Sequence, residues 1–178
     1  MERKTKARIV KWGKLFLTLV QIIAFVVLGT VLYSVAQIGV KTEKTMDFQY
    51  DPGENPFDPN DDRINYTVLV YLNNSGFYDI DFLYIYVEIY IENSTNNALL
   101  PPGDRIGMVE KNFTEISSGV LNLRYMLIVQ VLAKYVPGLV TQDAWLRVEY
   151  NIKIYSMGIT ILANGTFYQQ WDHTTLQP

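Results

Sequence analysis

The sequence contains no cysteine and only one histidine, His173, and both scarcities narrow the chemistry open to it. Without cysteine there is no disulfide framework, no thiol nucleophile and no cysteine-ligated zinc or iron–sulfur site. A single histidine in the polar C-terminal tail gives a hydrolytic triad or a multi-histidine metal site nothing to draw on. We expect His173 to be a solvated tail residue and the chain to hold no metal and no cofactor.

Signs of catalysis are also scarce. The sequence has no glycine-rich loop of the kind that holds phosphate groups. A glycosidase needs two carboxylates facing each other across a cleft, and among the candidates only Asp81 has the inward parity of its predicted strand. We therefore expect the chain not to be an enzyme, and an extracytoplasmic hydrolase is the least supported alternative. The candidate carboxylates are Asp79, Asp81, Glu88 and Glu92.

Basic side chains are scarce beyond the N-terminus. Residues 41–178 carry nine basic and seventeen acidic side chains, whereas residues 1–14 carry six basic side chains and one glutamate. Nucleic-acid binding depends on neutralising phosphates with lysine and arginine. The acidic part of the chain therefore excludes a nucleic-acid partner.

One uncharged run, Leu15–Val40, stands out because it is 26 residues long. A helix needs about 20 apolar residues to cross a bilayer, and the hydrophobic region of a cleaved signal is about 7 to 15 residues long. The segment Ser34-Val35-Ala36 resembles a signal cleavage site, but the length favours a retained anchor. We expect Leu15–Val40 to bind the lipid bilayer as one transmembrane helix, with Trp12 and Tyr33 near the two interfaces.

Two features bear on how this helix sits in the membrane. The six basic residues precede it, so the positive-inside rule places the N-terminus in the cytoplasm and the rest of the chain outside. Gln21 and the pair Thr30 and Ser34 are candidates for a helix–helix contact in a homo-oligomer, although ordinary composition explains them better.

Five Asn-x-Ser/Thr triplets follow the helix, where roughly one would be expected by chance in the whole chain from its twelve asparagines. As a set they predict N-glycosylation of an extracytoplasmic surface. The acceptors are Asn65, Asn73, Asn93, Asn112 and Asn164.

Residues 41–63 read as an acidic, proline-rich linker between the helix and a folded domain. Asp58, Asn60 and Asp62 alternate like the start of a calcium-binding loop. Arg63 and Leu69 stand where that loop needs glycine and glutamate, which excludes a calcium site of this type.

From residue 64 onward, alternation of apolar and polar residues predicts β-strands. Pro101-Pro102-Gly103 and a turn-like stretch, Asn112–Val120, separate strands. Met126–Val136 is ambiguous between a strand and a short helix, which Pro137-Gly138 would end. Asn164-Gly165 predicts a hairpin turn. The residues expected in the core are Ile64, Tyr66, Val68, Val70 and Leu72, then Leu83, Ile85, Val87, Ile89 and Ile91, and then Val148, Tyr150, Ile152 and Ile154.

Polar residues occupy the opposite parity of the last of these strands, where Arg147, Glu149 and Lys153 are expected to be exposed. The opposite parity of the strand around Ile85 is different, because it is mostly aromatic. Such a row is a candidate contact surface for a protein, glycan or lipid, although cross-strand pairing of tyrosines on a half-exposed face is the commoner explanation. The row consists of Phe82, Tyr84, Tyr86 and Tyr90, with Glu88 among them.

Six or seven short strands at this spacing predict an all-β, Ig-like antiparallel β-sandwich. The stretch from INYTVLVYLNNS through FYDIDFLYIYVEIYI to VEYNIKIYSMGITILANGTFY resembles the LEA-2 (late embryogenesis abundant) β-sandwich over about Ile64 to Trp171. The LEA-2 first strand commonly ends in Asn-Pro, whereas this one ends in Asn73-Asn74. The resemblance implies a membrane-tethered domain without an established catalytic site, with a binding or envelope-structural role.

A different class of protein fits the same outline. Archaeal pilin-like or other surface-filament subunits have a long hydrophobic helix in the assembly core beneath a glycosylated β-domain. Their processing motif ends in a basic residue and glycine, whereas Gly13 here follows Trp12 and precedes Lys14. The expected division is a cytoplasmic tail (1–14), a transmembrane helix (15–40), a linker (41–63), a β-sandwich (64–172) and a tail (173–178), which places the protein in the cell membrane with a single span.

Overall fold

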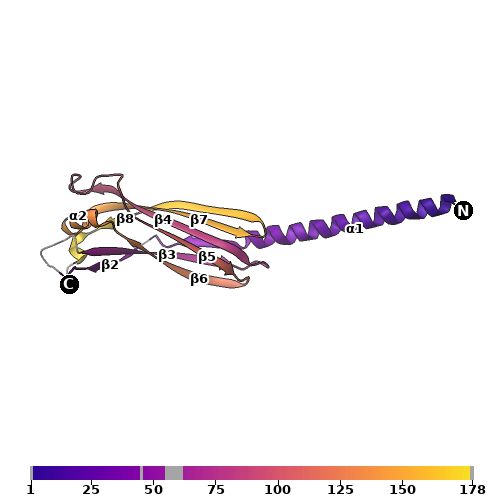
Figure 1. Cartoon of the computed structure of the whole chain (residues 1–178), viewed down its shortest axis with the longest axis horizontal. Helices are drawn as coiled ribbons and strands as arrows, with labels where there is room; N and C mark the ends of the chain where they lie inside the picture. Colours follow the sequence, from indigo (N-terminus) through magenta and orange to yellow (C-terminus); the bar gives the residue numbers. More distant parts are fainter. Residues whose placement is uncertain (1, 45, 55–61, 177–178) are drawn as a thin grey trace.

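The computed structural model describes residues 2–44, 46–54 and 62–176, and shows a β-sandwich from one end of which a long helix projects (Figure 1). The N-terminus lies at the far end of the helix and the C-terminus at the opposite end of the sandwich. The elements are α1 (Glu2–Ala36), β1 (Ile38–Thr42), β2 (Asp47–Asp51), β3 (Arg63–Asn74), β4 (Ile80–Ser94), β5 (Arg105–Ile116), β6 (Val120–Gln130), η1 (Ala133–Tyr135), α2 (Val136–Thr141), β7 (Ala144–Ser156), β8 (Ile159–Trp171) and η2 (His173–Leu176).

Two antiparallel sheets of four strands form the sandwich, which confirms the predicted fold class. In the first sheet, β3 pairs along one edge with β1 and then β2, and along its other edge with β6. In the second sheet the order is β5-β4-β7-β8. We call the second sheet the ladder sheet, because the aromatic row of β4 lies on it.

The core lies between the sheets and follows the predicted alternation. The inward side chains of β3 and β4 are buried, and Val148, Ile152 and Ile154 on β7 are completely inaccessible to solvent. Burial of such alternating rows from both sheets is what holds a sandwich together. Tyr150 shares their parity but is only half-buried, and its ring lies over Gly165, its partner on β8.

The outward residues of β7 are less exposed than predicted. Arg147, Glu149 and Lys153 are half-buried, because β7 is an interior strand between β4 and β8. Arg147 contacts the ring of Tyr90, and Lys153 contacts the ring of Tyr84.

The helix and the linker differ from the predicted boundaries. The helix ends at Ala36, and Ile38–Val40 belong to β1 rather than to the anchor. Within the predicted linker, residues 47–51 form β2. Both strands pair with one edge of β3, whose backbone N–H and C=O groups would otherwise be unpaired in the sheet. The candidate calcium-loop residues Asp58 and Asn60 lie outside the described residues.

The structure specifies the segments between the later strands more closely than the sequence patterns did. The stretch predicted to be turn-like continues as β5 to Ile116, because its residues pair with β4 as far as Ile80. The ambiguous stretch is a strand to Gln130 and is followed by η1 and α2. Pro137 lies in the first turn of α2 rather than ending a helix, since the first helical turn needs no N–H from it.

The hairpin turn is formed by Met157 and Gly158, both with positive φ, and β8 runs straight through Asn164-Gly165. Glycine is required at position 165 because a neighbouring side chain packs against it, not because the chain turns there. A Cβ atom there would lie 2.6 Å from Cζ of Tyr150, whose ring occupies the space above it.

Candidate functional site

The aromatic row lies on the outer face of the ladder sheet, along the interior strand β4. Phe82, Tyr84, Tyr86 and Tyr90 alternate with core residues and therefore point away from the opposite sheet of the sandwich, which contains β3. All four are half-buried, since β5 flanks them on one side and β7 on the other. The structure thus brings the predicted contact residues together on one surface.

Glu88 organises this surface. One of its carboxylate oxygens accepts hydrogen bonds from the hydroxyl of Tyr86 (2.8 Å) and from Nη1 of Arg105 (2.6 Å). The other accepts a hydrogen bond from the hydroxyl of Tyr90 (3.0 Å). Burial alone would raise the pKa of Glu88, but these three donors outweigh it and hold the pKa below the ordinary value of glutamate. Glu88 therefore remains charged and fixes two rings of the row.

Cations and neighbouring rings complete the surface. The rings of Tyr84 and Tyr86 stack with centroids 6.4 Å apart. The guanidinium of Arg147 lies 4.9 Å from the centroid of Tyr90, and Nζ of Lys153 lies 5.6 Å from that of Tyr84. Cations over ring faces are attracted by the ring quadrupole. The row is a polar aromatic surface with charges of both signs.

Beside the row there is an open groove with a volume of about 400 Å³. Its lining residues come from β4, β7 and β8 and include hydroxyl, amide and carboxylate side chains. A groove of this composition suits a polar, hydrogen-bonding ligand more than an apolar one. The residues that line it are Tyr86, Glu88, Glu149, Tyr150, Asn151, Asn164, Gly165 and Thr166.

The predicted glycan acceptors fall into two groups. Asn93, Asn112 and Asn164 are exposed on the outer face of the ladder sheet. Asn65 and Asn73 are half-buried on the central strand of the other sheet, and the amide oxygen of Asn73 accepts a hydrogen bond from the backbone N–H of Asn122 (2.6 Å). The first group is therefore the more accessible to a transferase.

Two of the exposed acceptors border the aromatic surface, which the sequence did not indicate. Asn112 on β5 pairs directly with Tyr84, and Asn164 lines the groove. A sugar on Asn112 would lie within reach of the Tyr84 ring, because side chains of directly opposed residues are neighbours on the same face. The predicted acceptors Asn112 and Asn164 therefore lie beside this surface.

The other candidate carboxylates accept hydrogen bonds from backbone N–H groups or form ion pairs. Asp79 accepts a hydrogen bond from the N–H of Ser118 (2.6 Å), and Asp81 accepts one from the N–H of Met157 (3.1 Å). Glu92 lies 3.6 Å from Nε of Arg147. Asp81 is exposed despite its inward parity, because it stands at the start of β4. The structure does not bring these groups together with Glu88 as an acid–base pair.

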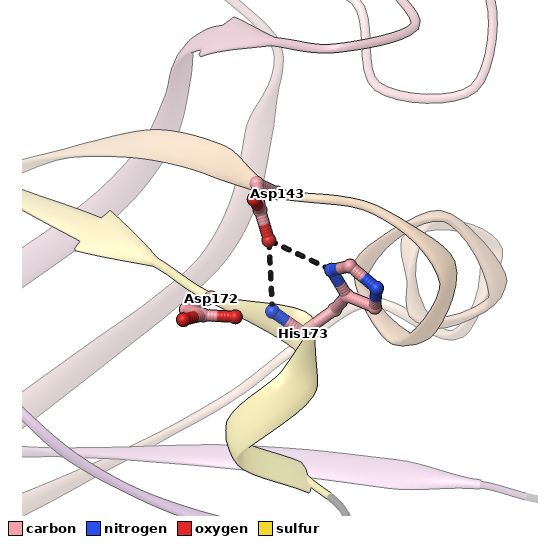
Figure 2. A group of neighbouring side chains, drawn as sticks. All are labelled: Asp143, Asp172 and His173. Carbon is pink, nitrogen blue, oxygen red and sulfur yellow. Dashed lines mark hydrogen bonds and ion pairs between the residues drawn. The ribbon is translucent and has the colours of Figure 1, made fainter.

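At the end of the sandwich away from α1, three potential metal ligands lie close together: Asp143, Asp172 and His173, whose ligand atoms are all within 4.8 Å of one another (Figure 2). One oxygen of Asp143 accepts a hydrogen bond from the backbone N–H of His173 (3.1 Å). The same oxygen lies 2.7 Å from Nδ1 of the His173 ring, with which it forms a second hydrogen bond. These bonds lower the pKa of Asp143. His173 is thus half-buried and joined to Asp143, and the prediction of a solvated tail residue is wrong. The partner is 30 residues away, so no local signal pointed to it.

Comparison with known proteins gives likeness of fold only. No protein-family model matches the chain, and no curated protein matches it. Among solved structures, a putative late embryogenesis abundant protein is 11% identical with a TM-score of 0.36, over 85% of this chain and 88% of that one.

Two further structures are as distant. The target SoR45 is 14% identical with a TM-score of 0.40, over 75% of this chain and 86% of that chain. A β-glucuronidase of Bacteroides uniformis is 12% identical with a TM-score of 0.39, and the match covers 76% of this chain but only 13% of the enzyme. The activity in the last title belongs to that enzyme.

Proposed function

We propose that this chain is a single-pass membrane protein that presents a glycosylated, LEA-2-like β-sandwich outside the cytoplasm as a non-catalytic binding module. The segment Trp12–Ala36 is long and apolar enough to span a membrane, with a mean hydropathy of 2.6. Its side chains from residue 12 to residue 29 are exposed, as a lipid-facing helix requires.

The observation that carries the binding role is the aromatic row fixed by Glu88. Aromatic side chains are enriched in contact surfaces because they bury much area at little entropic cost. Here Tyr86 and Tyr90 are held in place before any partner arrives. Preorganisation of this kind reduces the entropic cost of binding.

The test is binding of a defined component to the full chain. We would extract the native protein in mild detergent, identify what copurifies, and measure rebinding of that purified component to the wild type and to the double variant Tyr84→Ser/Tyr86→Ser. We expect the double variant to lose at least tenfold in affinity. The matched control is Tyr71→Ser on the other sheet, where the hydroxyl also bonds a glutamate, Glu43 (3.3 Å), and this variant should bind normally. Equal binding by all three proteins would remove the basis of the proposal.

Intact-mass measurement of the same preparation reports two further properties. It gives the number of occupied glycan sites, and mass analysis of peptides from the same preparation shows whether Asn112, beside the row, is one of them. It also gives the mature N-terminus: a chain that begins near Lys14 instead of Met1 would favour a processed filament subunit over the retained anchor.

A further inference from the structure

The end of α1 is packed into the sandwich. The side chain of Ser34 is completely buried, and its hydroxyl accepts a hydrogen bond from the backbone N–H of Tyr78 (3.1 Å). The hydroxyls of Thr30 and Tyr78 lie 3.1 Å apart. Gly76 permits this close approach, because a Cβ atom there would lie 2.6 Å from the carbonyl oxygen of Ser34. The turn between β3 and β4 is thereby fixed against the last two turns of the helix.

This contact sets the depth of the turn relative to a bilayer. Trp12 and Tyr33 are separated by about 31 Å along a helix, which matches the hydrocarbon thickness of about 30 Å. With Trp12 at one interface, Tyr33 lies at the other, where aromatic residues are enriched. The ring of Phe77 stacks on Tyr33 with centroids 5.5 Å apart. Phe77, which is 66% exposed, therefore lies at the level of the lipid headgroups.

Two other turns reach the same end of the sandwich. Asp79 holds the turn between β5 and β6 through the N–H of Ser118, and Asp81 holds the turn between β7 and β8 through the N–H of Met157. The apolar side chains that these turns and the start of β6 present to solvent include Met157 (47% exposed) and Leu121 (64% exposed). Figure 1 shows these strand ends gathered around the base of α1.

We propose that the membrane-facing turns of the sandwich dock on the bilayer that α1 spans, with Phe77, Met157 and Leu121 inserted among the lipids of the outer leaflet. The partner is a lipid interface, since α1 brings these side chains to that depth. Apolar and aromatic side chains gain free energy on entering the interface. Because the inserted side chains are apolar and uncharged, docking does not require anionic lipid. This inference extends the proposed function, because a docked sandwich would hold the aromatic row at a fixed height above the membrane.

The absence of cysteine makes the test direct. The full chain would be reconstituted in phosphatidylcholine vesicles with single spin labels introduced by Phe77→Cys, Met157→Cys and, as a matched control, Leu99→Cys. Leu99 is 51% exposed in the loop between β4 and β5, at the end of the sandwich away from α1. Accessibility of each label to oxygen, which partitions into lipid, is compared with accessibility to a water-soluble nickel chelate.

We expect the labels at residues 77 and 157 to have an oxygen-to-nickel ratio at least threefold above that at residue 99. Equal ratios at all three positions would overturn the proposal. The ring contact with α1 is made by Phe77, whereas the backbone N–H of Met157 bonds to Asp81. The label at residue 157 therefore reports docking even if Phe77→Cys loosens the helix contact. Adding Tyr84→Ser/Tyr86→Ser should leave the ratios unchanged, so that loss of partner binding and loss of membrane docking are separable outcomes.

Discussion

At the scale of single residues, Glu88 fixes the positions of two tyrosine rings on the aromatic surface through its hydrogen bonds. A carboxylate on an exposed strand is ordinarily solvated, whereas the side chain of Glu88 is only 16% exposed beside Arg105. Its three donors stabilise the ionised form relative to the protonated one. The unfolded chain offers no such donors, so the pKa of Glu88 is lower in the folded protein than in the unfolded chain.

The stability of the domain should therefore depend on Glu88 under acid conditions. Because the folded pKa is depressed, the stabilisation is fully present above the unfolded pKa of about 4.3 and is lost as pH falls through the folded pKa. We expect the urea midpoint of the wild type to fall between pH 5 and pH 3, and that of Glu88→Gln to fall less steeply. The control is Glu110→Gln, an exposed glutamate on β5, which should retain the wild-type slope. Parallel curves for wild type and Glu88→Gln would contradict the assigned role.

Gly165 gives a second prediction at this scale. The ring of Tyr150 fills the space where a Cβ atom would be, so Gly165→Ala forces the ring or the strand to move. Overpacking of this kind costs about 1 to 3 kcal/mol. Thermal or urea unfolding of Gly165→Ala should show this loss, and Tyr150→Leu in the same chain should recover part of it. An alanine variant as stable as the wild type would mean that Tyr150 has another position to occupy.

At the scale of elements, two adjacent residues of β7 differ in burial and should therefore differ in their contribution to stability. Ile152 is completely buried between the sheets, while Lys153 is half-buried over Tyr84. We expect Ile152→Ala to lower the free energy of unfolding by about 2 to 5 kcal/mol, through lost transfer energy and the cavity left behind. Lys153→Ala should cost less than about 1 kcal/mol, the magnitude of an exposed cation–π contact. Similar losses in the two variants, measured by urea unfolding, would show that the register of β7 is wrong.

The elements also show what sequence patterns predict and what they miss. Alternation identified the core rows of β3, β4 and β7, because burial of one sheet face imposes a period of two. It missed β1 and β2, since each is only five residues long: Ile38 and Val40 continue the apolar run of the helix, and Phe48 and Tyr50 of β2, which pack against the core, stand in an acidic, proline-rich stretch.

Asn-Gly was misread as a turn for a related reason. Residue 165 has to be glycine because the ring of Tyr150 on the neighbouring strand fills the space of a side chain. The local sequence carries no information about that contact. The same limit applies to the surface. The outward parity of Tyr84 and Tyr86 was predictable, but the hydrogen bonds that join Tyr86 and Arg105 to Glu88 depend on the pairing of β4 with β5.

At the scale of the whole molecule, the anchor and the sandwich form one continuous structure. Only Gln37 separates α1 from β1, and β1 is hydrogen-bonded to β3. The buried hydroxyl of Ser34 and the stacked pair of Tyr33 and Phe77 add side-chain contacts at the same place. If α1 spans a bilayer as proposed, the tilt of the helix sets the tilt of the sandwich, and partner contacts on the ladder sheet would occur at a defined distance from the lipid.

The last prediction concerns which side of the membrane carries the sandwich. The six basic residues before Leu15 favour a cytoplasmic N-terminus, and three exposed glycan acceptors on the ladder sheet agree with an extracytoplasmic domain. Two single-cysteine variants, Leu99→Cys in the sandwich and Thr5→Cys in the basic segment, report the two sides independently. In intact cells or right-side-out vesicles, a membrane-impermeant maleimide should label residue 99 at once and residue 5 only after permeabilisation. Because the chain has no native cysteine, any other labelling pattern comes from these positions alone, and the reverse pattern would invert the proposed topology.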